Sequence, residues 1–243
     1  MNYKGSSAYD ESDFLENYLK RRSRKDSPNN AIEGPAIDLL LGSVKGAHIL
    51  DLGCGDGSYG RELLDKEARS YTGVEGSGAM VKLAVSQIDS SKSTIIHTGM
   101  EDYQFPENEF DVVLSRMALH YINDLEKLFR LISQTMTDNG KFVFSVQHPL
   151  TTASFASKAG GEKRGNWLVD DYFQQGARQE PWIGKTVVKY HRSIESYYNA
   201  LMSAGFQVVS LQEGEPKMEN FTDSKEFERR KRIPVVLIFS CRK

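Results

Sequence analysis

Short apolar runs alternate with amphipathic segments along the first 150 residues. Five runs are rich in Val, Ile, Leu or Phe and are too short for buried helices, so they predict strands. These runs cover residues 47–51, 70–75, 94–97, 110–115 and 141–147. Helices are predicted at 58–66, 77–87 and 125–136, with Asn139-Gly140 ending the last of them. Strands that alternate with helices indicate βαβ units and a mostly parallel, doubly wound α/β sheet.

The pattern upstream of this alternation is different. Residues 1–30 are polar apart from a short helical pattern at 14–19. Pro35 suits the first turn of a helix and Gly42 suits a C-terminal stop, so a helix is predicted at 35–42. We therefore expect a helical segment to precede the first strand.

The pattern also changes after Pro149. Residues 151–190 contain several aromatic residues and show no clear period. A segment of this length is unusual as a simple connection, which predicts a lid or a substrate-facing insertion. Regular structure returns with a helix at 193–204 and strands at 206–211 and 235–240.

Composition narrows the class of protein. The 243 residues suit one elaborated α/β domain, and the 31 basic and 33 acidic residues give a net charge of -2. Such a balance argues against a chain built to coat nucleic acid or an anionic membrane. Cys54 and Cys241 form neither a disulfide framework nor a four-ligand zinc site, so no metal is expected. Without a signal-peptide core or a bilayer-spanning run, the chain is expected to be cytoplasmic.

The sequence DLGCGDG at 51–57 is the clearest chemical feature. Alternate glycines after a strand allow a ligand to approach the backbone, and the following helix offers free N–H groups. Residues 55–60 also match the G-x-G-x-x-G pattern of dinucleotide sites. Glu75 ends the second strand, where a ribose-binding acid belongs. The glycines alone therefore fit either a dinucleotide or an adenosyl ligand.

The acidic residues of the loop distinguish between these two possible ligands. Placing Asp51 and Asp56 around a dianionic pyrophosphate is costly, and residues 46–60 contain no Lys or Arg. A ligand with an ammonium group, a sulfonium and no phosphate is compatible with both carboxylates. S-adenosylmethionine is such a ligand.

Four stretches then carry a resemblance to a known family. They are HILDLGCGDGSYG (48–60), YTGVEGSGAMVKLA (71–84), MEDYQFPENEFDVVLSRMALHYI (100–122) and LISQTMTDNGKFVFSVQHP (131–149). In this order they resemble the class I S-adenosylmethionine-dependent methyltransferases. The sequence looks most like the small-molecule branch related to the ubiquinone and menaquinone methylases (methyltransferase type 11). The resemblance is close over 31–149 and looser over 190–241.

The resemblance implies a Rossmann-like sheet of seven strands with an antiparallel last strand. It also implies a single methyltransferase domain over residues 1–243. Its expected parts are an N-terminal helical cap (1–42), a cofactor-binding core (43–149), a lid or substrate insertion (150–190) and the C-terminal part of the sheet (191–243).

The family's cofactor contacts come from the ends of the first four strands. Carried onto this sequence they are Asp51, Gly53, Cys54, Gly55, Glu75, Gly76, Ser77, Met100, Glu101, Asp102, Ser115 and Arg116. The resemblance implies that the Glu75 carboxylate accepts hydrogen bonds from both ribose hydroxyls. The family's usual acid near adenine is missing here, so Glu101 or Asp102 with the Met100 backbone is expected to read the base. Plain solvated acids are the alternative.

A general base is needed only when the methyl acceptor keeps a proton. His148 follows the fifth strand and His191 precedes the helix after the insertion, so both are candidate catalytic bases. His120 is a candidate for substrate contact. No Asn-Pro-Pro-Tyr motif follows the fourth strand, where 115–118 read SRMA, and this absence disfavours methylases of DNA and protein amides. A structural role for each histidine is the alternative.

The sequence predicts methyl transfer to an O, N or C atom of a small-molecule acceptor, with S-adenosylhomocysteine as the product. Arg116, Arg192, Arg21 and Arg22 favour an acceptor with an anionic group. An RNA methyltransferase is an alternative because of the basic clusters at 20–25 and 229–232. A protein that binds the cofactor without turnover is another. The chain is expected to act as a monomer or homodimer, without nucleic acid or membrane as a partner.

Overall fold

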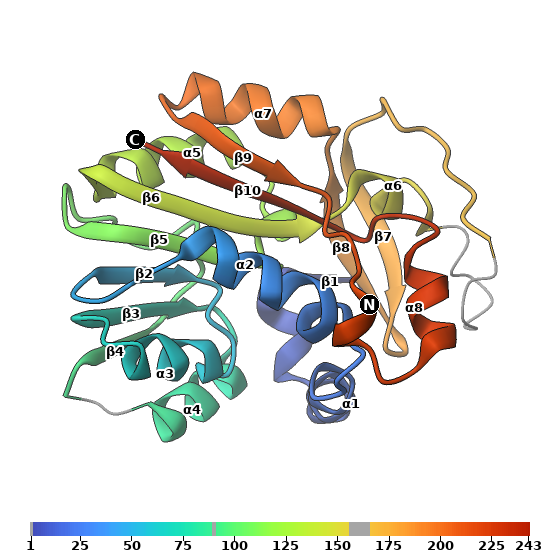
Figure 1. Cartoon of the computed structure of the whole chain (residues 1–243), viewed down its shortest axis with the longest axis horizontal. Helices are drawn as coiled ribbons and strands as arrows, with labels where there is room; N and C mark the ends of the chain where they lie inside the picture. Colours follow the sequence, from blue (N-terminus) through green and yellow to red (C-terminus); the bar gives the residue numbers. More distant parts are fainter. Residues whose placement is uncertain (1, 89–90, 156–165) are drawn as a thin grey trace.

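A seven-stranded sheet forms the centre of the computed structural model, which describes residues 2–88, 91–155 and 166–243 (Figure 1). Its strand order is β4-β3-β2-β5-β6-β10-β9. β10 runs antiparallel to both of its neighbours, and the other pairings are parallel. The strands are β2 (His48–Leu52), β3 (Ser70–Glu75), β4 (Ser93–His97), β5 (Phe110–Arg116), β6 (Met136–Gln147), β9 (Gln207–Gln212) and β10 (Val236–Arg242). The doubly wound sheet with an antiparallel last strand is therefore confirmed.

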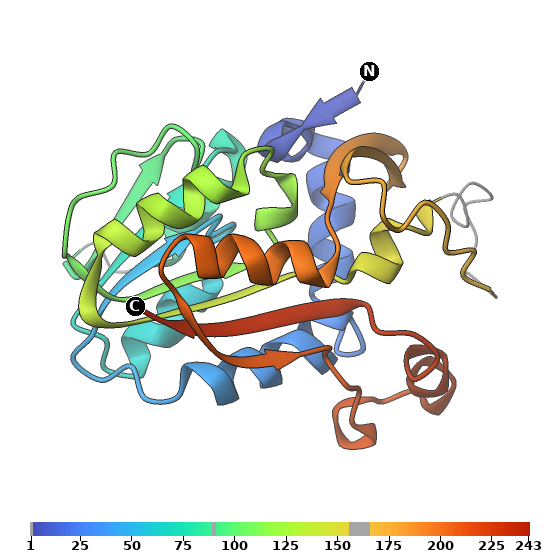
Figure 2. The same ribbon diagram turned by 90° about the horizontal axis from the view of Figure 1, so that it is seen from above.

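Helices cover both faces of this sheet. One core lies between the sheet and helices α5 (Leu125–Thr135) and α7 (Ile194–Ser203), which lie side by side in Figure 2. The other core lies between the sheet and helices α2 (Gly34–Leu41) and α3 (Ser58–Asp65), and α4 (Gly78–Gln87) packs next to α3. Alternate residues of the central strands enter opposite cores, which explains why these strands read as continuous apolar runs.

A small second sheet lies beyond the carboxyl ends of the parallel strands (Figure 1). It consists of β1 (Asn2–Lys4), β8 (Lys185–His191) and β7 (Gly176–Trp182), in that order. β7 and β8 form a hairpin whose two-residue turn has positive φ at Ile183 and Gly184, as a type I′ turn requires. The insertion therefore contains regular structure that the sequence pattern did not predict.

The chain before α2 packs against this small sheet. Besides β1, it contains η1 (Gly5–Asp10), α1 (Ser12–Arg22) and η2 (Asn29–Glu33). We call residues 2–33 the N-terminal segment. β1 pairs in parallel with β8, so the start of the chain and the insertion together cover the end of the central sheet.

Two further differences from the sequence prediction are local. α5 ends at Thr135 and β6 begins at Met136, so Asn139-Gly140 lies within the strand instead of ending the helix. The reason is tertiary, since Met136 pairs with Phe110 of β5 before the register shifts. The polar stretch before β10 also contains a short helix, α8 (Ser224–Arg230). Short turns η3 (Leu119–Tyr121), α6 (Pro149–Thr152) and η5 (Met218–Asn220) complete the described structure.

Within the described ranges, no helix has both the length and the apolar character needed to cross a bilayer.

Candidate functional site

The glycine loop leaves β2 at the edge of the sheet where all the parallel strands end. Gly53, Gly55 and Gly57 have φ values of 79°, 60° and 75°. A Cβ on Gly53 would lie 2.6 Å from the Ala118 Cβ, and a Cβ on Gly57 would lie 2.7 Å from the Ile88 Cδ1. A Cβ on Gly55 would meet nothing within 4 Å. Packing therefore requires two of the glycines, and the third leaves the backbone open to a ligand.

Glu75 joins this loop to the end of β3. Its Oε2 accepts a hydrogen bond from the Gly55 N–H at 3.0 Å, and its Oε1 accepts one from the Ser77 N–H at 2.8 Å. Burial raises the pKa of Glu75, and these backbone hydrogen bonds oppose the rise. Each carboxylate oxygen has a further lone pair for a ligand hydroxyl.

Asp51 is a buried carboxyl group beneath the same loop. Its Oδ2 accepts a hydrogen bond from the Tyr71 hydroxyl at 2.8 Å, and its Oδ1 has no hydrogen-bond partner among the described residues. Burial raises the pKa of Asp51 to about 7, although the Tyr71 hydrogen bond opposes this. An unpaired buried carboxylate oxygen is costly, so this position favours a ligand that brings a cation or a donor.

Ser77 and Gly76 lie under the N-terminal segment. The Ser77 hydroxyl donates to Asp10 Oδ1 at 2.8 Å, and the Ala79 N–H donates to the same oxygen at 3.1 Å. A Cβ on Gly76 would lie 2.4 Å from the Ser6 Oγ. Sequence reasoning missed that residues from η1 cover this part of the site, because nothing local marks a contact between segments so far apart.

Ser115 and Arg116 end β5 beside the glycine loop. The buried Ser115 hydroxyl donates to the Leu52 carbonyl at 2.6 Å and so ties β5 to β2. Arg116 donates from Nε to Glu33 Oε1 at 3.0 Å and from Nη2 to Oε2 at 2.5 Å. Its guanidinium lies 4.1 Å from the centroid of the Tyr59 ring. Arg116 is thus a mostly buried arginine that is paired with Glu33 and lines two cavities.

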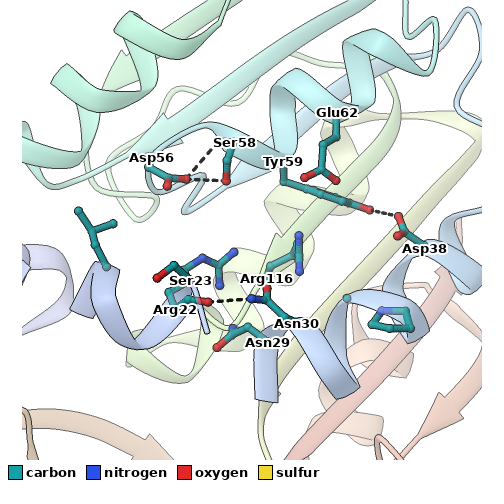
Figure 3. Close-up of a pocket in the computed structure, with 13 residues that line it drawn as sticks. Arg22, Ser23, Asn29, Asn30, Asp38, Asp56, Ser58, Tyr59, Glu62 and Arg116 are labelled. Carbon is teal, nitrogen blue, oxygen red and sulfur yellow. Dashed lines mark hydrogen bonds between the residues drawn. The ribbon is translucent and has the colours of Figure 1, made fainter. Parts of the chain in front are cut away.

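Two neighbouring cavities open beside the loop. The smaller, of about 50 Å³, is lined by Asp51 and by the loop glycines at 53 and 55. The larger, of about 460 Å³, lies between the end of α1, η2, α2 and the start of α3 (Figure 3). Both are lined by Arg22, Asp56, Ser58, Tyr59 and Arg116. The two cavities therefore form one region in which basic groups face the acids of the loop.

Of the four arginines predicted to gather around an anionic group, two line this region. Figure 3 shows Arg22 and Arg116 across the cavity from Asp56. Arg22 forms no ion pair within the described part of the chain. Arg192 instead donates to the carbonyls of Ile122 and Asn123, which ties the chain after β8 to the turn after β5. Arg21 does not line either cavity.

The remaining predicted cofactor residues divide into two groups. Met100 lies at the loop, with its Cε 3.3 Å from the position of a Cβ on Gly53, and Cys54 packs its buried Sγ against Gly73. Glu101 and Asp102 lie in an exposed turn. Reading of an adenine ring by these two acids stays a prediction.

Neither candidate base lines either of the two cavities. His148 accepts from the Leu150 N–H through Nδ1 and contacts Glu213 Oε1 through Nε2 at 2.9 Å. His191 contacts the Thr152 hydroxyl through Nδ1 and the Tyr172 carbonyl through Nε2. Burial lowers the pKa of both rings, although the Glu213 carboxylate opposes this at His148. The catalytic role predicted for the two histidines stays a prediction.

The structure also defines the contacts of His120 and of two aromatic residues of the insertion, Trp182 and Tyr172. The His120 Nδ1 accepts from the Gln147 N–H at 3.4 Å, and its ring lies 4.6 Å from that of Tyr121. Of the insertion's aromatic residues, Trp182 packs against rings of the N-terminal segment, whereas Tyr172 packs against His191.

Sequence reasoning missed one polar group at this end of the sheet. Lys189 of β8 and Glu180 of β7 form a fully buried ion pair beneath the aromatic residues of the N-terminal segment. The β-branched and aromatic residues Thr186, Val187, Val188 and Tyr190 were a possible signal for a strand. The ion pair itself had no signal, because it depends on the fold of the hairpin.

Comparisons with known proteins bear on the family of this chain. A family model described as a methyltransferase domain matches residues 50–144. The solved structure of an S-adenosylmethionine-dependent methyltransferase from Mesorhizobium loti is similar, with a TM-score of 0.80, 31% identity, and coverage of 89% of this chain and 100% of that chain. An uncharacterized protein of Haemophilus influenzae is 30% identical over an alignment of 251 positions, which covers 98% of this chain and 97% of that protein. Phosphoethanolamine N-methyltransferase 2 of Caenorhabditis elegans is 31% identical over 124 residues, which cover 49% of this chain and 28% of that protein.

Proposed function

This chain belongs to the class I S-adenosylmethionine-dependent methyltransferases, and we propose that its methyl acceptor is a small molecule bound at the enclosed carboxyl edge of the sheet. The enzyme uses S-adenosylmethionine and releases S-adenosylhomocysteine. The observation that carries the proposal is the enclosure itself. The N-terminal segment and the small sheet cover the edge where the parallel strands end, and the cavity of about 460 Å³ lies within the size range of small-molecule sites.

The residues at the glycine loop fit the cofactor. Asp51 has an unpaired buried oxygen for a cationic group, and Gly55 leaves its backbone open. We propose that the Glu75 carboxylate binds the two ribose hydroxyls. We also propose that Arg22 and Arg116 face the carboxylate of the methionine group or an anionic group of the acceptor.

When bound, the cofactor supplies a methyl group on a sulfonium, which is already a good leaving group. The protein therefore contributes mainly by orienting the acceptor and excluding water. In this proposal the buried carboxylates of Asp51 and Glu75 fix the orientation of the cofactor. The N-terminal segment limits access of water because η1 is held on α4 by Asp10.

Ion pairs within the two basic clusters, at 20–25 and 229–232, support a small acceptor over RNA. Arg229 and Arg230 both bind Glu226, and Lys231 lies 3.6 Å from Glu228. In the other cluster Lys20 pairs with Glu16 at 2.6 Å. A polyanion would have to compete with these carboxylates, which weakens a basic surface as an RNA site. The relative named phosphoethanolamine N-methyltransferase 2 adds support for a small acceptor.

The test compares acceptor classes with one readout. Purified protein and S-adenosylmethionine are incubated with fractionated small-molecule extracts and, separately, with total tRNA and rRNA at low salt, and S-adenosylhomocysteine is measured. We expect release above background in a small-molecule fraction and none with RNA. Release with RNA alone would favour the RNA alternative and remove the proposal.

The titration of Asp51 predicts pH-dependent cofactor binding. A pKa of about 7 means that the Asp51 carboxylate is mostly protonated at pH 6 and mostly ionised at pH 8. Because the ionised form attracts a cationic ligand, the affinity advantage of wild type over Asp51→Asn should rise about tenfold from pH 6 to pH 8. Calorimetric titration of both proteins at the two pH values measures this ratio. The variant corrects for titration of the ligand's own amine, and a ratio that does not change with pH would contradict the assignment.

A further inference from the structure

The buried ion pair beneath the small sheet is the starting observation. Lys189 and Glu180 lie on the same face of the β7–β8 hairpin, with side chains 1% and 0% exposed, and their Nζ and Oε2 atoms are in direct contact. Gln147, the last residue of β6, donates from Nε2 to Glu180 Oε2 at 3.2 Å. The Gln147 Oε1 is buried and has no hydrogen-bond partner among the described residues. This polar group therefore lies at the carboxyl end of the central sheet and has an acceptor oxygen to spare.

A layer of aromatic rings connects this pair to the glycine loop. The Lys189 Nζ lies 4.4 Å from the centroid of the Trp182 ring and 5.1 Å from that of Tyr121. The Tyr18 ring lies 5.8 Å from the Trp182 ring, and Tyr18 also lines the smaller cavity at the loop. The Tyr9 and Tyr121 hydroxyl oxygens are 3.4 Å apart. A single aromatic layer therefore separates the pair from the place where the methyl donor binds.

Folding alone does not explain an ion pair in this position. Removing two charges from water is costly, and well-packed apolar residues usually replace a buried pair without loss of stability. Ionisable groups with strongly perturbed titration in a site are candidates for function. Burial lowers the pKa of Lys189 well below its usual range. The groups that face Lys189 are Glu180 from β7, Tyr121 from η3, and beyond them Tyr9 and Tyr18 from the N-terminal segment.

We propose that the Lys189–Glu180 pair is the catalytic proton acceptor, and that the methyl acceptor is a planar molecule that reacts through an O–H or N–H group. Its ring would stack within the aromatic layer, between the pair and the smaller cavity that Tyr18 lines. The proposal rests on the proposed function, since it assumes a small acceptor. It assigns the base to residues other than His148 and His191.

The step balances in atoms and charge. A lone pair of the acceptor atom forms the bond to the methyl carbon, and sulfur keeps the electron pair of the broken C–S bond. The acceptor's proton passes to the pair. The amine and the carboxylate together hold one exchangeable acidic proton before the step and two after it. The pair gains one positive charge as the sulfonium loses one, so the net charge of the enclosed site stays constant. Enclosed sites favour such a balance because isolated charge is costly there.

Three variants test the proposal with the full-length protein. Lys189→Met removes the amine of the pair, and Lys189→Met/Glu180→Leu removes both charges so that no buried carboxylate is left unpaired. Lys185→Met changes a partly exposed lysine of the same strand and is the matched control. The double variant should unfold at or above the wild-type temperature and bind S-adenosylmethionine with a Kd within twofold of wild type. Its turnover of the acceptor found in the small-molecule screen should fall about 100-fold or more, whereas the control keeps its turnover.

A second readout does not depend on turnover. With ¹⁵N-labelled lysine, the Nζ signal that disappears in Lys189→Met should titrate below the pH range of the other lysines in the protein without ligand. Titration together with the other lysines would overturn the proposal. So would a double variant that binds the cofactor and turns over at the wild-type rate, and this result would leave the proposed function intact. Wild-type protein that releases no S-adenosylhomocysteine with any small molecule would overturn the proposed function and this proposal together.

Discussion

Replacing Glu75 by alanine is expected to weaken S-adenosylmethionine binding by about two orders of magnitude. In the proposed site the Glu75 carboxylate accepts one hydrogen bond from each ribose hydroxyl. Hydrogen bonds to a charged group contribute about 1.5–3 kcal/mol each, so the loss of two costs at least about 3 kcal/mol, or roughly 150-fold in Kd. Isothermal titration calorimetry of wild type and Glu75→Ala measures this difference directly.

The controls separate ribose binding from loop stability. Glu75 also accepts from the Gly55 and Ser77 N–H groups, so its loss frees two backbone donors. Glu75→Gln keeps the shape and one acceptor oxygen, and we expect an intermediate Kd. Glu107→Ala changes an exposed acid and should leave the Kd unchanged. If Glu75→Ala keeps its folded structure by thermal unfolding and binds within threefold of wild type, the ribose assignment is wrong.

The inner strands of the central sheet were predictable because they are buried on both sides. In β10, Leu237 and Phe239 enter one core, whereas Val236 and Ile238 enter the other. A strand of this kind must be apolar at nearly every position, and the run is visible without any knowledge of its neighbours. The hairpin of β7 and β8 was not predicted, because neither strand is a long apolar run. Its turn also gave no signal, since Ile183 has positive φ where asparagine or aspartate is usual.

The glycine loop was predictable for a related reason. The positive φ values of Gly53, Gly55 and Gly57 are properties of one short segment, so residue types alone reveal them. The closure of the site was not predictable. It depends on contacts such as that of Asp10 with Ser77, and on β1 pairing with β8, which join distant parts of the chain.

The histidines show the limit of reasoning from residue type. His148 and His191 stand near the ends of strands, where catalytic groups are common, and their chemistry suits a base. Their hydrogen-bond partners, Glu213 and Thr152, lie on segments whose positions the sequence did not indicate. The base proposed from the structure is instead the Lys189–Glu180 pair, whose residues sequence reasoning did not consider for this role.

Replacing Arg116 by methionine is expected to cost about 3–5 kcal/mol of unfolding free energy at pH 7. The side chains of Arg116 and Glu33 are 12% and 0% exposed, so the variant leaves a fully buried carboxylate without its charge partner. The Ser145 hydroxyl, 2.7 Å from Glu33 Oε1, and the nearby charge of Arg22 remain as compensation for that carboxylate. Urea unfolding of the protein without ligand measures the loss. Arg130→Met is the matched control, because Arg130 pairs with Glu126 at the surface and should cost less than about 1 kcal/mol.

The pH dependence of this loss distinguishes a missing charge from lost packing. Burial alone would raise the pKa of Glu33, but Arg116 and hydrogen bonds hold it below its usual value in the wild type. That depressed pKa stabilises the wild type above the unfolded pKa of about 4.3, and this stabilisation disappears as the pH falls through the folded pKa. In Arg116→Met the pKa of Glu33 should rise, so its carboxyl protonates in the folded state and the difference from wild type shrinks toward pH 4. Arg116→Met/Glu33→Gln should recover part of the stability at pH 7, because its buried amide needs no counter-charge. A stability loss that is equal at pH 4 and pH 7 and is not reduced in the double variant would show that Arg116 acts through its packing on Tyr59.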